Sequence, residues 1–172
     1  MNTELPRPTT THVDAVARHA ARLAAVQAIY QMELTSLDAE TVIAEFIEHR
    51  FTADPEISPA GLPDTVFFAD LVRGVPNRQT EIDRAIAECL STDWKFSRID
   101  SILRAILRAA GFELIARSDV PAKVVIDEYL DITHAFFQGD EAGFVNAALD
   151  RLARNKRGAE LGEDPRDGKR QS

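Results

Sequence analysis

Two pairs of side chains have the spacing of helical metal ligands. Asp131 and His134 are three residues apart, and Glu45 and His49 are four apart, so the members of each pair would share one face of a helix. A di-metal carboxylate site in a helical bundle takes two Glu-x-x-His pairs and two more glutamates from facing helices. Because each pair stands alone, we expect surface ion pairs or hydrogen-bonded histidines here, and no bound metal.

The sequence lacks the patterns that are typical of nucleophilic catalysis and of cofactor binding. Cys89, the single cysteine, falls among helical apolar positions and is expected to be a small buried hydrophobe. Gly-x-Ser-x-Gly, Walker-type and Gly-x-Gly-x-x-Gly sequences are absent. We therefore expect a protein that is not an enzyme and that takes no cofactor.

Cations near the start of the first predicted helix suggest a different chemistry. Arg18, His19 and Arg22 lie within five residues of one another, and the two arginines, four apart, would share a helix face. Arginine side chains and the backbone N–H groups of a helix N-terminus both bind phosphate. The pattern is compatible with nucleic-acid binding and also with an ordinary solvated helix face.

The charge of the chain is negative and unevenly distributed. The chain has 172 residues and a formal net charge of −8, which by itself argues against nucleic-acid binding. Residues 32–70 hold nine acids and one arginine, whereas residues 95–117 and 151–172 each sum to +3. This distribution indicates either solvated helix faces or two surfaces, one for an anion and one for a cationic partner.

Composition also limits the cellular setting. A single cysteine excludes a disulfide scaffold and a site built from several cysteines. No apolar run approaches the ~18 residues of a membrane span, and the first residues lack the basic-then-apolar order of a secretory signal. We expect a cytoplasmic protein that makes no membrane contact.

Apolar residues recur at helical spacing along most of the chain, and no strand alternation of useful length appears. Pro76 predicts a kink or break within its helical region, and Asp38, Asp64 and Asp140 are placed to cap helices. Arg108, inside an apolar row, is expected to hold a neighbouring helix through a carboxylate. We predict an all-α fold of about seven helices, over 13–34, 39–50, 64–90 with its break, 98–116, 121–137 and 140–157.

A weak seam near residues 91–97 is predicted to divide the helices into two groups. The N-terminal subdomain would span 13–92 and the C-terminal subdomain 93–157, with Trp94 and Phe96 anchoring the linker. Residues 158–172 are rich in charge and contain glycine and proline, so we predict a disordered tail there.

Four ordered motifs then identify a family. They are residues 21–30 (ARLAAVQAIY), 106–114 (ILRAAGFEL), 117–129 (RSDVPAKVVIDEY) and 144–150 (FVNAALD). Together they resemble the NusB family of bacterial transcription antitermination factors. The resemblance implies two roughly perpendicular helical subdomains and an RNA-binding role. It also implies pairing with the small-subunit ribosomal protein NusE to hold boxA RNA of ribosomal-RNA leaders within the antitermination complex of Nus factors and RNA polymerase.

The resemblance also implies which residues bind. The RNA surface carries over to Arg18, His19, Arg22 and Phe144, and the ribosomal-protein surface carries over to Tyr30 and Asp140. Many family members have a run of three or more arginines close to the first helix, whereas this chain has Arg18 among threonines and alanines. Because each lost phosphate contact weakens binding, we predict weak RNA binding by the isolated chain and tighter binding with the basic partner. Family members occur as monomers and as homodimers, so the oligomeric state stays open.

Purely structural interpretations of the same residues stay open beside the binding roles. Tyr30 could be a buried core tyrosine, and Asp140 could serve as a helix cap. The whole chain could be an acidic protein-interaction module that makes no direct RNA contact.

Overall fold

The computed structural model describes residues 10–52, 54, 56, 61–91 and 95–162, with side chains from Asp14 onward. Within these residues the chain forms seven α-helices, a π-helical turn at Phe46–Arg50 and a 3-10 turn at Phe96–Arg98, and no strand. The all-α prediction is therefore confirmed. The α-helices are α1 Thr10–Thr35, α2 Ala39–Glu45, α3 Thr65–Asn77, α4 Gln79–Cys89, α5 Ser101–Ala116, α6 Ala122–Phe136 and α7 Glu141–Arg157.

Aspartate side chains begin three of these helices. Asp38, Asp64 and Asp100 each accept a hydrogen bond from a backbone N–H two or three residues further along the chain. Such a bond satisfies a donor that the first helical turn leaves without a partner. The first two are the predicted caps. Asp140 stands at the corresponding position before α7, but its side chain makes no capping hydrogen bond, so the prediction of a side-chain cap there was wrong.

A proline separates α3 from α4. Pro76 lies in the last turn of α3, and Arg78 leaves helical backbone geometry before α4 begins. Because the proline ring cannot donate a backbone hydrogen bond, the predicted break falls at this point. Gly74, in the preceding turn, lets α3 approach α5 closely, since a Cβ atom there would lie 2.2 Å from the Phe112 ring.

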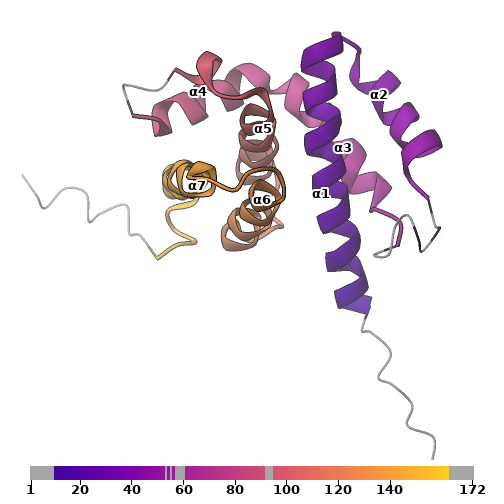
Figure 1. The fold of residues 1–172 in the computed structure, drawn as a ribbon. Helices are drawn as coiled ribbons and strands as arrows, with labels where there is room; N and C mark the ends of the chain where they lie inside the picture. Colours follow the sequence, from indigo (N-terminus) through magenta and orange to yellow (C-terminus); the bar gives the residue numbers. More distant parts are fainter. Residues whose placement is uncertain (1–9, 53, 55, 57–60, 92–94, 163–172) are drawn as a thin grey trace, which may run out of the picture.

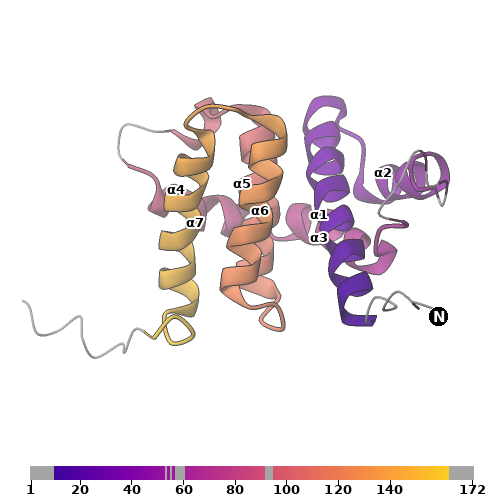
Figure 2. The same ribbon diagram turned by 60° about the horizontal axis from the view of Figure 1, so that its bottom comes forward.

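Helix α5 is the centre of the fold. It packs against α1, α3, α4, α6 and α7, and its middle turns are buried almost all round. Figures 1 and 2 both show α5 and α6 between α1 on one side and α7 on the other. A helix that is apolar on nearly every face needs neighbours in every direction, and α5 has them.

The other helices form two groups that meet at α5. Helices α1, α2 and α3 pack together, whereas α4, α6 and α7 surround the other sides of α5. In Figure 1 the axis of α1 lies in the plane of the picture, whereas α7 is viewed down its axis. The helix axes of the two groups therefore cross. The residue at which the subdomains divide stays a prediction. Helix α4, which the prediction assigns to the N-terminal subdomain, contacts α5 and α7.

The end of α7 continues into a short hydrogen-bonded turn. Residues 158–162, the first part of the predicted tail, are described, and the Glu160 carboxylate accepts a 2.7 Å hydrogen bond from the Ala122 N–H at the start of α6. The remaining tail residues, 163–172, and Trp94 of the predicted linker lie outside the described residues. In the described part of the chain, no helix is long and apolar enough to cross a bilayer.

Candidate RNA and partner surfaces

Arg22 lies beneath the surface where α1 crosses α5 and α6, and 3% of the residue is exposed. Its guanidinium donates two hydrogen bonds of 2.9 Å to the fully buried carboxylate of Glu113. The hydroxyl of Tyr129 donates a third to the same carboxylate, at 2.6 Å. Burial disfavours the charged guanidinium, but the hydrogen bonds and the attraction of Glu113 outweigh it, so the pKa of Arg22 is raised. Arg22 therefore joins three helices and contributes very little to the open surface.

His19 sits at the edge of this buried cluster. Its Nδ1 lies 2.5 Å from Oε2 of Glu128 on α6, and the same oxygen is 3.5 Å from Nη1 of Arg22. Glu128 thus bridges the surface imidazole to the buried guanidinium. A phosphate that approached His19 would compete with this carboxylate.

Arg18 lines a hollow of about 560 Å³ between the start of α1 and the start of α6. Its guanidinium carbon lies 4.8 Å from the centre of the Phe67 ring, and its Nε lies 3.9 Å from Oδ2 of Asp64. Carboxylates outnumber arginines around the hollow, with Asp14, Asp64, Asp119 and Glu128 against Arg18 and Arg22. The surface is therefore acidic, which suits a cationic group better than a phosphate.

The turn after α5 places Asp119 in the lining of the same hollow, where it pairs with Arg117. Arg117 donates two hydrogen bonds of 2.9 Å to Asp119, and these lower the pKa of Asp119 to about 2. Arg117 also donates to Asp70 on α3, at 2.8 Å, so the turn is fixed to the neighbouring helix. Sequence reasoning missed both members of this pair. The signal that could have found them is their place within the family motif 117–129.

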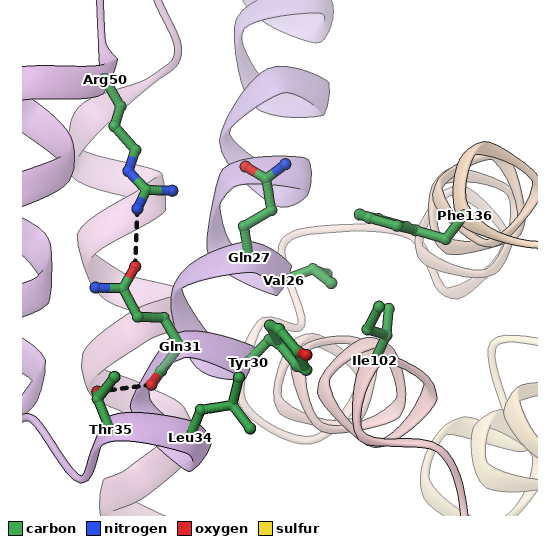
Figure 3. A pocket seen from close by; sticks show the side chains of 9 residues that line it. All are labelled: Val26, Gln27, Tyr30, Gln31, Leu34, Thr35, Arg50, Ile102 and Phe136. Carbon is green, nitrogen blue, oxygen red and sulfur yellow. Dashed lines mark hydrogen bonds between the residues drawn. The ribbon is translucent and has the colours of Figure 1, made fainter.

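A second hollow, of about 380 Å³, is an apolar groove between α1 and the neighbouring ends of α5 and α6. Figure 3 shows Tyr30 and Leu34 from α1, Ile102 from α5 and Phe136 from α6 around this groove. Tyr30 is half-buried in its wall, while 61% of Leu34 and 37% of Phe136 are exposed. Tyr30 is thus accessible from the groove and is not a fully buried core residue.

Hydrogen bonds among three side chains form the polar side of the groove. The Gln31 side chain accepts a 3.0 Å hydrogen bond from Arg50 and donates one of 2.8 Å to Glu45 (Figure 3 shows the first). These bonds hold the π-helical turn after α2 against α1. Sequence reasoning missed Leu34, Arg50 and Phe136 as groove residues, because their proximity depends on how three helices pack.

Phe144 lies in a different part of the molecule from Arg18. It is half-buried and lines a third hollow with residues from the end of α4 and with Arg151 of α7. Figure 2 shows α7 and α1 on opposite sides of α5 and α6. The predicted RNA residues therefore do not form one cluster. Asp140 is exposed in the turn between α6 and α7, four residues after the groove residue Phe136.

The residues with potential for metal binding or nucleophilic chemistry have ordinary surroundings. Among the residues that the structure describes, no three His, Cys, Asp or Glu side chains gather as a metal site would require. Cys89 is buried, and its Sγ donates to the Ala85 carbonyl. Burial raises the pKa of the Cys89 thiol, which favours the unreactive protonated form.

The sequence model of the NusB family matches residues 19–154 of this chain. The chain belongs to the NusB family. The transcription antitermination protein NusB of Caulobacter vibrioides is 51% identical to it over 140 residues, which cover 81% of this chain and 94% of the relative. The corresponding protein of Maricaulis maris is 53% identical over 140 residues, which cover 81% and 88%.

Solved structures of NusB have the same fold as this NusB-family chain. A Thermotoga maritima NusB structure superposes with a TM-score of 0.70 at 26% identity, covering 85% of this chain and 97% of the other. A chain from the structure of antitermination factors NusB and NusE in complex with double-stranded RNA has a TM-score of 0.66 at 22% identity, covering 81% and 97%. That second likeness concerns the fold alone. The family that the four motifs predicted is confirmed.

Proposed function

We propose that this chain is a transcription antitermination factor that binds RNA together with the ribosomal protein NusE. The observation that carries the proposal is the NusB-family match over residues 19–154, with half of the aligned residues shared with the Caulobacter vibrioides protein. The RNA is the boxA element of ribosomal-RNA leader transcripts, and the complex helps RNA polymerase to read through terminators. This role is one of binding and uses no catalytic group.

NusE binds, in this proposal, at the groove that contains Tyr30. The supporting observation is that Leu34 and Phe136 expose apolar surface beside Tyr30, as the core of a protein interface requires. Asp140, exposed after α6, adds a negative charge for a basic partner. The net charge of −8 favours association with such a partner.

The RNA is held mainly by the complex in this proposal. Arg18 and His19 each have a nearby carboxylate, so a phosphate binds them in competition with Asp64 and Glu128. Arg22 supports the RNA surface from beneath by holding α1 against α5 and α6. We therefore expect weak RNA binding by the isolated chain and much tighter binding once the basic partner is present.

An exposed apolar residue in the groove provides the test of this function. Leu34→Asp places a charge in the groove, and Val66→Asp makes the same change at a residue of α3 that is 80% exposed. We expect Leu34→Asp to abolish NusE binding in calorimetry and the NusE-dependent gel shift of boxA RNA, and Val66→Asp to preserve both. Equal behaviour of the two variants, or equal RNA affinity of the wild type with and without NusE, would contradict the proposal.

One observation favours a second candidate function, an acidic interaction module that makes no RNA contact of its own. The hollow around Arg18 is lined by more carboxylates than arginines. Photo-crosslinking of boxA RNA to the complex with NusE separates the two candidates. Crosslinks to α1 or α7 of this chain support direct RNA binding, whereas crosslinks confined to NusE support the interaction module.

Three wider features belong to the same proposal. The complex with NusE joins a larger assembly of Nus factors and RNA polymerase, and the protein acts in the cytoplasm. A homodimer is compatible with the family and would compete with RNA if its interface covered α1. Light scattering of the purified chain measures the mass and decides between monomer and dimer.

A further inference from the structure

One carboxylate lies between a surface cation and a buried cation of α1. Oε2 of Glu128 is 2.5 Å from Nδ1 of His19 and 3.5 Å from Nη1 of Arg22. The His19 side chain is 41% exposed, whereas that of Arg22 is 3% exposed. The same oxygen atom of Glu128 therefore contacts both the outer surface of α1 and the cluster buried beneath it.

The guanidinium of Arg22 has room for a closer contact with this carboxylate. Its Nε and Nη2 both donate to Glu113, so Nη1 is the nitrogen that faces Glu128. A separation of 3.5 Å is longer than a good hydrogen bond, so a rotation of the Glu128 side chain towards Nη1 would strengthen this ion pair. Glu128 can thus leave the His19 imidazole without becoming an unpaired, partly buried charge, which would be costly.

The carboxylate beside Arg18 lacks this freedom. Oδ2 of Asp64 lies 3.9 Å from Nε of Arg18, while Oδ1 accepts the capping hydrogen bond from the Phe67 N–H. A movement of Asp64 away from Arg18 would disturb the first turn of α3, which this cap stabilises. Of these two carboxylates, Glu128 is therefore the one that can give up its surface cation to a ligand.

We propose that Glu128 is an internal competitor of RNA at the His19 imidazole. An RNA phosphate accepts the hydrogen bond of His19, and the displaced carboxylate moves to Nη1 of Arg22. The two anions accept from the same nitrogen, so they cannot occupy it together. This inference rests on the proposed RNA-binding function and names a residue that lowers the affinity of the α1 surface for RNA.

The test removes the charge of Glu128 and keeps the shape of its side chain. Glu128→Gln, as a full chain in complex with NusE, is titrated against a fluorescent single-stranded boxA RNA at fixed salt. We expect the affinity to rise about two- to fivefold, the range that corresponds to a partly exposed ion pair. Asp127→Asn is the matched control, because Asp127 is the exposed neighbour on α6 and the change in net charge is the same. The control should gain less affinity.

A second set of variants tests whether the effect passes through His19. In a His19→Ala background the imidazole is absent, so Glu128→Gln should raise the affinity no more than Asp127→Asn does. The NMR signals of the His19 imidazole nitrogens give a direct readout, and the His19→Ala variant assigns them. In the wild-type complex these signals should shift when RNA is added, which a purely structural role of Glu128 would not cause.

Failure of this inference can be distinguished from failure of the proposed function. A wild-type complex that does not bind the RNA overturns the function itself. A wild-type complex that binds, with no greater affinity for Glu128→Gln than for Asp127→Asn, overturns the role of Glu128. An equal gain with and without His19, or His19 signals that RNA leaves unchanged, also overturns it. Circular dichroism records the melting curves, and Glu128→Ala, which suits a helix, replaces Glu128→Gln if that variant unfolds early.

Discussion

Replacing Glu113 by glutamine would remove the closer of the two carboxylates that face the buried guanidinium of Arg22 and leave Glu128, at 3.5 Å, as the other. The carboxylate accepts two hydrogen bonds from Arg22 and one from Tyr129, and both Glu113 and Tyr129 are fully buried. Breaking a buried ion pair by removing one partner costs about 3–5 kcal/mol, because the remaining charge stays desolvated. For a chain of this size, that loss lowers the melting temperature by roughly 6–20 °C.

Urea unfolding followed by circular dichroism measures this loss. Glu81→Gln is the matched control, because Glu81 is exposed and pairs with Arg78 three residues before it on the surface. Surface pairs of this kind contribute about 0–1 kcal/mol. A second comparison uses Arg22→Met together with Glu113→Gln, which removes both charges. The double variant should lose less stability than the sum of the two single variants, since each single variant leaves the other buried charge without this partner and the double variant removes both charges.

A loss of unfolding free energy in Glu113→Gln no greater than that in the Glu81→Gln control would refute a stabilising role for the buried pair. That result would mean that water or local rearrangement solvates the Arg22 guanidinium. The outcome also affects how RNA-binding measurements are interpreted. If Arg22 supports the fold, an Arg22 variant loses RNA affinity through unfolding, so affinity must be compared at equal folded fraction. Arg18, which is partly exposed, is then the fairer position for testing an RNA contact at α1.

Two further predictions concern the buried hydroxyl of Tyr129 and the guanidinium of Arg157. Burial and the negative charge of Glu113 raise the pKa of Tyr129 well above its ordinary value. The wild type should therefore lose stability as the pH rises past about 10, where the unfolded tyrosine ionises first. Tyr129→Phe should lack this loss and be about 1.5–3 kcal/mol less stable at pH 7, which urea unfolding at both pH values checks. The nearly buried guanidinium of Arg157 donates to four backbone carbonyls at the end of α5 and in the turn after it. Arg157→Gln should lower the free energy of unfolding by at least about 1–3 kcal/mol. A loss no greater than that of the surface variant Arg154→Gln would contradict this expectation.

Local spacing was sufficient to predict the helices and several of their details. Apolar periodicity located the α-helices, since a helix needs one continuous apolar face, but the second was predicted to reach Arg50, whereas α2 ends at Glu45 and Phe46–Arg50 forms a π-helical turn. Arg108, predicted to hold a neighbouring helix through a carboxylate, donates two hydrogen bonds of 2.9 and 3.0 Å to Asp83 on α4. The start of α5 was placed three residues early, because Phe96–Arg98 forms a separate 3-10 turn before the cap at Asp100.

The arrangement of the candidate sites could not be predicted in the same way. Arg22 pairs with a residue 91 positions away, and no local pattern reports such a pairing. The clue was Glu113 itself, an acid inside an apolar stretch of α5. The resemblance to the family grouped Phe144 with the cations of α1, while the packing of α5 and α6 between α1 and α7 separates them.

The basic segment 95–117 shows how tertiary pairing changes a charge prediction. Arg104 and Arg108 both pair with Glu33 of α1, and Arg108 also pairs with Asp83. These arginines are therefore occupied in holding helices together, and a sum of charges along the chain overstates what they offer to an anion.

The contacts of Arg157 and Glu160 also bear on the order in which the protein can fold during synthesis. These two residues fix the turn between α5 and α6 and the first N–H of α6, yet they lie more than forty residues after the end of α5. A nascent chain that has released α1 to α6 from the ribosome still lacks the groups that complete this turn. The surface around Arg18 and Asp119 can therefore reach its final geometry only after α7 has emerged, so a chain that ends within α7 cannot complete it.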